Sequence, residues 1–135
     1  MEDTGLDIEV LGIDLLERES PTALEVRELC VLALASAGIE EGHMAVEFVE
    51  EDRIRVLNRD YRQLDKPTDV LSFGVDEDGD SPGPRELGDI VICPEHTTDL
   101  REAIVHGTLH LTGMDHEVDN GEMLALQAEL MRWVR

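Results

Sequence analysis

The chain has 135 residues, 41% of them apolar, which predicts one folded domain over residues 1–135. No apolar run approaches the roughly 20 residues that a membrane-spanning helix needs, and the acidic N-terminus lacks the basic and apolar parts of a signal peptide. The two cysteines, Cys30 and Cys93, form no paired motif, and Cys30 lies in an apolar stretch that predicts burial. These features exclude a membrane protein and a secreted disulfide scaffold, and they predict a cytoplasmic protein.

The elements predicted from hydrophobic periodicity and turn residues mix strands and helices along the chain. They are a strand at 6–10, a helix opened by Ser20-Pro21-Thr22 and ended by Gly38, a strand near 44–49, a helix at 52–62, strands at 69–73 and 87–93, a helix from Pro94 to about Leu111, and a helix from about Asn120 to Val134. Proline is expected in the first turn of its helix, where a missing N–H is tolerated. The predicted fold class is α+β, a small mixed sheet of about four strands packed with helices.

Two segments between these elements are informative. The helix at 52–62 spaces Ile54, Leu57 and Tyr61 to face a core. Residues 76–86 are acidic and rich in glycine and proline, which predicts an exposed loop. This loop lacks the ligand spacing and terminal glutamate of an EF-hand, so we do not expect it to bind calcium.

The net charge of −21 argues against general nucleic-acid binding, because contacts to phosphate need lysine and arginine. Five of the eleven basic residues, however, fall between positions 53 and 66, where only Asp60 and Asp65 oppose them. They are Arg53, Arg55, Arg59, Arg62 and Lys66. This basic segment predicts one surface that docks RNA, although an ordinary solvated helix face explains the same pattern.

Three of the five histidines lie within the segment HGTLHLTGMDH at 106–116. Residues at i and i+4 share one face of a helix, so His106 and His110 can direct imidazole nitrogens at one ion. Gly113 accepts left-handed dihedral angles, which lets the chain bend and bring in His116. The spacing therefore predicts a metal site on a zincin-like helix, whereas surface or capping histidines would not require this regular pattern.

Three neutral imidazoles suit Zn²⁺, and nickel, cobalt and iron also bind such donors. We expect one zinc ion per chain. Three protein ligands keep a fourth position for water, as in catalytic rather than structural sites, and water bound there ionises near neutral pH. The same HxxxHxxGxxH spacing occurs in metzincin proteases, whose general base is a glutamate directly after the first histidine. Gly107 holds that position here, so a zincin-like protease is the disfavoured alternative.

The string HGTLHLTGMDH resembles the signature of the YbeY family, bacterial single-strand-specific endoribonucleases that take part in ribosomal RNA maturation. Two more blocks match the family in its own order: Leu57-Asn58 and Tyr61-Arg62 followed by KPTDVLSF at 66–73, then LGDIVIC at 87–93. The resemblance covers roughly residues 44–132. Only sixteen residues separate Asp89 from His106, fewer than the family pattern leads us to expect, so the entry to the metal helix departs from it.

The resemblance implies that His106, His110 and His116 are zinc ligands and that Arg62 is functionally important. A planar guanidinium can hold a phosphate oxygen while charge builds on it, which gives Arg62 a physical role. Asp115, beside a ligand, can accept a proton or orient an imidazole, and we favour the second role. Attack by water at the metal and attack by the RNA 2′-OH both stay open.

The function that the resemblance implies is zinc-dependent cleavage of single-stranded RNA in maturation of the 3′ end of 16S rRNA and in ribosome quality control. Its partners would be rRNA and the ribosome or ribosomal proteins, and no oligomeric state is indicated. One alternative is a non-catalytic ribosome-assembly factor in which zinc only stabilises the fold. A metallohydrolase that acts on some other ester is the third possibility.

Overall fold

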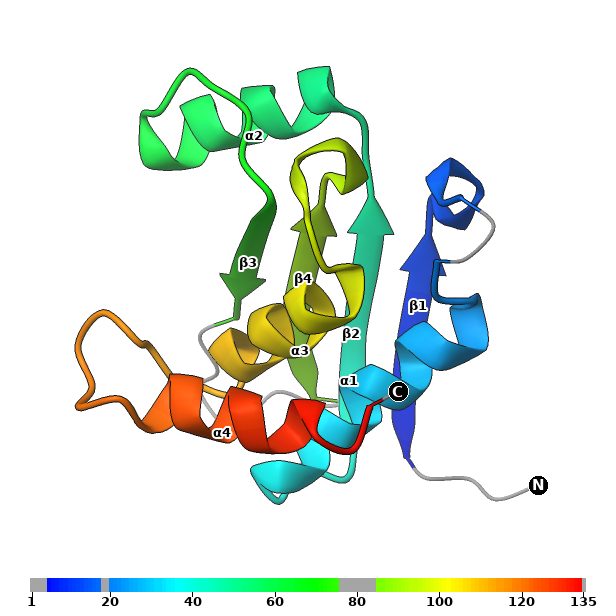
Figure 1. The fold of residues 1–135 in the computed structure, drawn as a ribbon, viewed down its shortest axis with the longest axis vertical. Helices are drawn as coiled ribbons and strands as arrows, with labels where there is room; N and C mark the ends of the chain where they lie inside the picture. Colours follow the sequence, from blue (N-terminus) through cyan, green and yellow to red (C-terminus); the bar gives the residue numbers. More distant parts are fainter. Residues whose placement is uncertain (1–4, 18–19, 76–84, 135) are drawn as a thin grey trace.

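The computed structural model describes residues 5–17, 20–75 and 85–134, which form a four-stranded sheet with helices packed on it (Figure 1). The strands are β1 (Leu6–Leu11), β2 (Gly42–Phe48), β3 (Val70–Gly74) and β4 (Glu86–Ile92), in the order β1-β2-β4-β3. β1, β2 and β4 run parallel, and β3 pairs with β4 in the antiparallel sense. The predicted α+β class with a small mixed sheet is confirmed.

The described helices are α1 (Ala23–Ser36), α2 (Glu51–Arg62), α3 (Leu100–Leu111) and α4 (Glu122–Met131), with short 3-10 turns at Ile13–Leu15 and Pro94–His96. Figure 1 shows α1 and α3 in front of the sheet, α4 beside α3, and α2 at the far end of the strands. None of these helices is long and apolar enough to cross a membrane.

The sheet buries side chains on both faces because successive residues of a strand point to opposite sides. Ile90 and Ile92 of β4 belong to the main core, which α1, α3 and α4 share. Val91 and Cys93 belong to a second, smaller cluster with Ile54 of α2. Helix α2 therefore packs against the opposite face of the sheet from α3.

Two details of the predicted helices at 52–62 and after Ser20 need correction. Tyr61 does not face a core: it is 65% exposed, and its ring packs edge-to-face with that of Phe73, with ring centroids 5.2 Å apart. The buried residues of this helix are Ile54 and Asn58. Pro21 precedes the helix, because the hydroxyl of Thr22 accepts the Glu25 N–H and makes Thr22 the N-cap.

The segment from residue 94 is not one continuous helix. Pro94–His96 forms a 3-10 turn, and α3 begins only after Asp99, whose carboxylate caps the N–H of Glu102 at 3.1 Å. Residues 76–84 of the predicted acidic loop lie outside the described residues, and Glu86 already belongs to β4.

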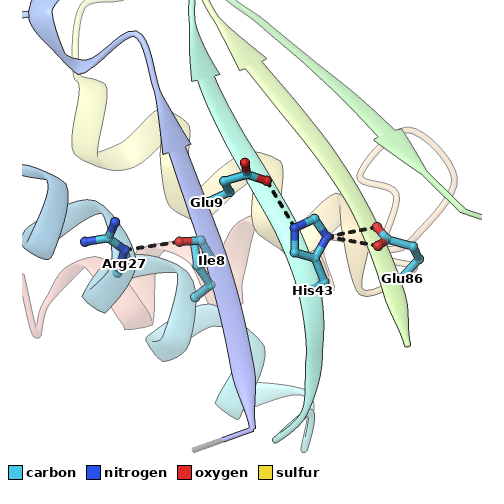
Figure 2. Close-up of polar contacts among 5 residues, drawn as sticks. All are labelled: Ile8, Glu9, Arg27, His43 and Glu86. Atoms are coloured by element: carbon cyan, nitrogen blue, oxygen red, sulfur yellow. Dashed lines mark hydrogen bonds and ion pairs between the residues drawn. The ribbon is translucent and has the colours of Figure 1, made fainter. Parts of the chain in front are cut away.

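One histidine outside the 106–116 motif connects three strands at one end of the sheet. His43 of β2 lies between Glu9 of β1 and Glu86 of β4, at 3.2 Å and 2.9 Å (Figure 2). The hydrogen bond to Glu86 is the main reason why the pKa of His43 is raised. In the same view Arg27 of α1 donates to the Ile8 carbonyl at 3.1 Å, which ties that helix to β1.

Candidate metal centre

Helix α3 carries His106 and His110 one turn apart, with ring centroids separated by 4.8 Å. Its opposite side is apolar and buried, including Ile104, Val105 and Leu109, so the helix is held on the sheet by its core face. Both histidines are half-buried and line a cleft of about 920 Å³. The helix therefore presents both rings to one open space while its other face is fixed.

The chain bends at Gly113, as predicted. Gly113 adopts φ of +104°, and its N–H donates to the His110 carbonyl at 3.0 Å. The next turn is shaped by Asp115, whose carboxylate accepts the N–H of Glu117 at 2.9 Å. His116 is thereby brought to 5.1 Å and 5.3 Å from the other two rings, measured between centroids.

The three rings present a donor set that fits a divalent metal. One nitrogen of each of His106, His110 and His116 lies within 4.8 Å of the others. The Nδ1 of His110 contacts the carbonyl oxygen of Met114 at 3.0 Å. A carbonyl can only accept, so Nδ1 carries the hydrogen and Nε2 keeps its lone pair. Burial, followed by the neighbouring His106, lowers the pKa of His110, which favours the neutral ring that a metal requires.

The position after His106 has no room for a catalytic glutamate. Gly107 is buried, and a Cβ placed on it would lie 2.8 Å from Cγ2 of Ile90. Its carbonyl also accepts the Ser72 hydroxyl at 3.2 Å, which joins α3 to β3. Because position 107 faces the sheet rather than the cleft, the general base of a metzincin protease has no counterpart there.

Arg62 and Asp115 line the same cleft as the three histidines. Arg62 is the last residue of α2, which ends because Gln63 takes a left-handed conformation with φ of 60°. The following loop is held by the buried Asn58, whose amide donates to the Lys66 carbonyl at 2.9 Å. The fold thus brings together all five residues that the sequence singled out, although Arg62 comes from a different element.

The other members of the basic segment do not join Arg62 in this cleft. Arg55 pairs with Asp65 at 2.9 Å, and Arg59 pairs with Asp60 at 3.2 Å. Arg53 lines a separate hollow of about 390 Å³ together with Tyr61 and Phe73. The segment is therefore divided between two surfaces, and its local excess of charge is partly neutralised.

The structure adds residues to the site that the sequence did not indicate. Further residues that line the cleft are Asp69, Ser72, Asp99, Glu102, Glu117 and Gln127. Gln127, on α4, contacts Nδ1 of His106 through its Oε1 at 2.7 Å. Two of them carried a local signal: Glu102 lies one helical turn before His106, and Glu117 directly follows His116.

Together, the fold and the site define a small α+β protein in which a helix and a glycine bend gather three histidines beside an arginine. The family model of endoribonuclease YbeY matches residues 17–135, and the chain belongs to this family. It is thus a member of a family of RNA-cleaving enzymes, as the resemblance predicted.

Individual relatives agree with this assignment. The endoribonuclease YbeY of Rubrobacter xylanophilus is 43% identical over 114 residues, which cover 80% of this chain and 82% of the relative. That of Geobacillus thermodenitrificans is 39% identical, with coverage of 90% and 94%. A solution structure of a Thermotoga maritima protein is similar, with a TM-score of 0.56, 31% identity, and coverage of 93% of this chain and 87% of the other.

Proposed function

We propose that this protein is a zinc-dependent endoribonuclease that cleaves single-stranded RNA, in maturation of the 3′ end of 16S rRNA and in ribosome quality control. The observation that supports this most strongly is the cluster of His106, His110 and His116 in a cleft that also contains Arg62. An arrangement of three neutral nitrogens is that of a catalytic metal site, and the nearby cation suits a phosphodiester.

The three histidines would hold the zinc ion, which when bound would supply Lewis-acid chemistry to a phosphate oxygen or a water molecule. Arg62 donates to a non-bridging phosphate oxygen and stabilises the charge that builds there. Asp115 acts by shaping the turn before His116, because one of its oxygens already accepts the Glu117 N–H. Positioning a ligand is therefore the role that we assign to it, rather than that of a general base.

The negative charge around the cleft makes Arg62 and the bound metal ion important for holding RNA. Five carboxylates line it: Asp69, Asp99, Glu102, Asp115 and Glu117. Their field repels an RNA phosphate, so a phosphate can be held only close to an opposing positive charge. Arg62 and a divalent ion in the histidine cluster supply that charge. We therefore expect RNA binding to weaken when either is removed.

The proposed substrate implies rRNA and the ribosome or its proteins as partners, and a cytoplasmic location. The match of the family model to residues 17–135 supports treating residues 1–135 as one YbeY-like domain. Arg62 is the member of the basic segment that lines the cleft with the three histidines, which supports RNA contact at the surface around Arg62.

Arg62→Ala, with Arg59→Ala as the matched control, tests the assignment of the cleft. Both residues lie in the last turn of α2, but Arg59 is paired with Asp60. Arg62→Ala should retain zinc, measured by elemental analysis, while cleavage of a labelled single-stranded RNA falls about 10²–10³-fold, as for loss of one transition-state donor. Arg59→Ala should cleave like the parent. Equal cleavage by the parent and both variants would contradict the role of Arg62.

His110→Ala and chelation test the metal. The variant should lose bound zinc, and chelator should abolish cleavage while the far-UV circular dichroism spectrum is kept, because α3 is anchored by its apolar face. Unfolding on chelation would instead indicate a non-catalytic factor that zinc only stabilises. RNA ends separate the two routes of cleavage, since 2′,3′-cyclic phosphates arise from internal attack and linear phosphates formed without them arise from attack by water.

A further inference from the structure

Gln127 connects the C-terminal helix to the histidine cluster. Helix α4 is fixed on the main core by the buried Met123 and Leu130. Gln127 lies between these two anchors, is half-buried and lines the cleft. Its Oε1 lies 2.7 Å from Nδ1 of His106, a residue 21 positions earlier in the chain.

This contact decides which nitrogen of His106 faces the cluster with a lone pair. A neutral imidazole carries one hydrogen, and only the nitrogen without it can bind a metal. When Gln127 accepts through Oε1, the hydrogen is on Nδ1 and the lone pair is on Nε2. The amide is a neutral partner, so it fixes this tautomer without adding a negative charge.

His106 needs a partner from another element, whereas His110 does not. His110 lies near the end of α3, where the chain bends and offers the free Met114 carbonyl to its Nδ1. His106 lies in the middle of α3, where backbone carbonyls are engaged in the hydrogen bonds of the helix. The side chain of Gln127 on α4 therefore accepts from His106 as the Met114 carbonyl accepts from His110.

We propose that Gln127 is a positioning residue for the metal centre, which fixes the Nδ1–H tautomer of His106 and thereby couples the docking of α4 to metal affinity. The proposal rests on the proposed function, because it assumes that the three histidines bind zinc. Hydrogen-bond partners of ligand histidines commonly change metal affinity by about 10- to 100-fold.

The test compares Gln127→Met, which keeps side-chain length but offers only a weakly accepting sulfur, with Gln127→Glu, whose carboxylate accepts the hydrogen bond. Glu129→Met on the exposed side of α4 is the matched control. Zinc affinity is measured by competition with a chelator. The tautomer of His106 is measured in the metal-free proteins at pH 8 by ¹⁵N–¹H correlation spectra of the imidazole ring.

We expect the parent to show the Nδ1–H tautomer and Gln127→Met to gain the Nε2–H form and to lose about 10- to 100-fold in zinc affinity. Gln127→Glu should restore the tautomer and keep or raise affinity, and Glu129→Met should match the parent in both measurements. If Gln127 only stabilised the fold, Gln127→Met would lower thermal stability without changing the tautomer of His106 or the affinity for zinc.

The outcomes separate this inference from the proposed function. Tight zinc binding by the parent together with unchanged affinity in Gln127→Met would overturn the role of Gln127 and leave the metal site intact. A parent that binds no zinc would overturn both. If Gln127→Met does not fold, the remaining measurements decide: an Nε2–H tautomer in the parent, or a large loss of affinity in Gln127→Glu, would refute the inference.

Discussion

Gly107→Ala tests whether α3 is held against the sheet as tightly as its contacts indicate. The added Cβ would lie 2.8 Å from Cγ2 and 3.2 Å from Cδ1 of Ile90, whereas ordinary contacts lie at 3.4–4 Å. Ile90 is fully buried and β-branched, so it has little freedom to move away. The substitution therefore overpacks the junction between the metal helix and β4.

Two effects of opposite sign determine the result. Alanine is a better helix former than glycine by about 1 kcal/mol, which stabilises the variant. Overpacking a close-packed core destabilises it by about 1–3 kcal/mol. Since the clash involves a stiff and buried side chain, we expect overpacking to prevail, with a net loss of about 1 kcal/mol in the free energy of unfolding.

Urea unfolding followed by circular dichroism, with chelator present to remove any effect of metal binding, measures this loss. Gly74→Ala is the control, because a Cβ there meets nothing within 4 Å. In an Ile90→Ala background both close contacts with Ile90 are absent, and of the three nearest contacts only the one with Ser72 Oγ, at 3.2 Å, is left. Gly107→Ala should then become neutral or stabilising by up to about 1 kcal/mol. The same destabilisation in both backgrounds would refute the reasoning.

Three further predictions concern ionisable groups. Because the pKa of His43 is raised in the folded protein, its contribution to stability is present below its unfolded-state pKa and is lost as pH rises through the folded-state pKa. In urea titrations, His43→Gln should therefore reduce the free energy of unfolding more at pH 5.5 than at pH 8.5. The pKa of Glu25 is lowered, chiefly by its hydrogen bond to Arg101, so Arg101→Ala should lower the free energy of unfolding by up to about 1 kcal/mol at pH 7 and by less at pH 3. A difference between parent and variant that does not change with pH would contradict this. Burial raises the pKa of Cys30 to about 12 and also raises the pKa of Cys93. A thiol reagent at pH 8 should therefore modify neither cysteine until denaturant is added. Rapid labelling of the native protein would contradict their burial.

Local sequence was sufficient wherever a short-range rule governs the structure. The spacing of His106 and His110 places them on one helical face whatever lies behind the helix, and the bend at Gly113 follows from the dihedral freedom of glycine. The mixed sheet was recognisable because strand and helix periods alternate along the chain. Each of these predictions depends on residues within about one or two helical turns of one another.

Boundaries and faces were less well predicted because they depend on capping and on neighbouring elements. Helix α3 begins after Asp99 rather than at Pro94, since the carboxylate of Asp99 accepts the N–H of Glu102 in the first turn of the helix. Tyr61 follows the apolar spacing of α2 and is nevertheless exposed, because its ring packs on Phe73 of β3, which is the edge strand of the sheet. Periodicity identifies an apolar face but not the extent of the surface that covers it.

The motif at 106–116 was enough to predict the histidine cluster, the bend that completes it and the family to which the chain belongs. The packing of the helices on the sheet was needed to show that Arg62 lies in the cleft of the histidines, that Arg53 lies elsewhere, and that Gln127 of α4 contacts His106. The physical reason is separation along the chain: these contacts depend on how the sheet positions α2, α3 and α4, and no local rule encodes a hydrogen bond between elements that meet only after the core has packed.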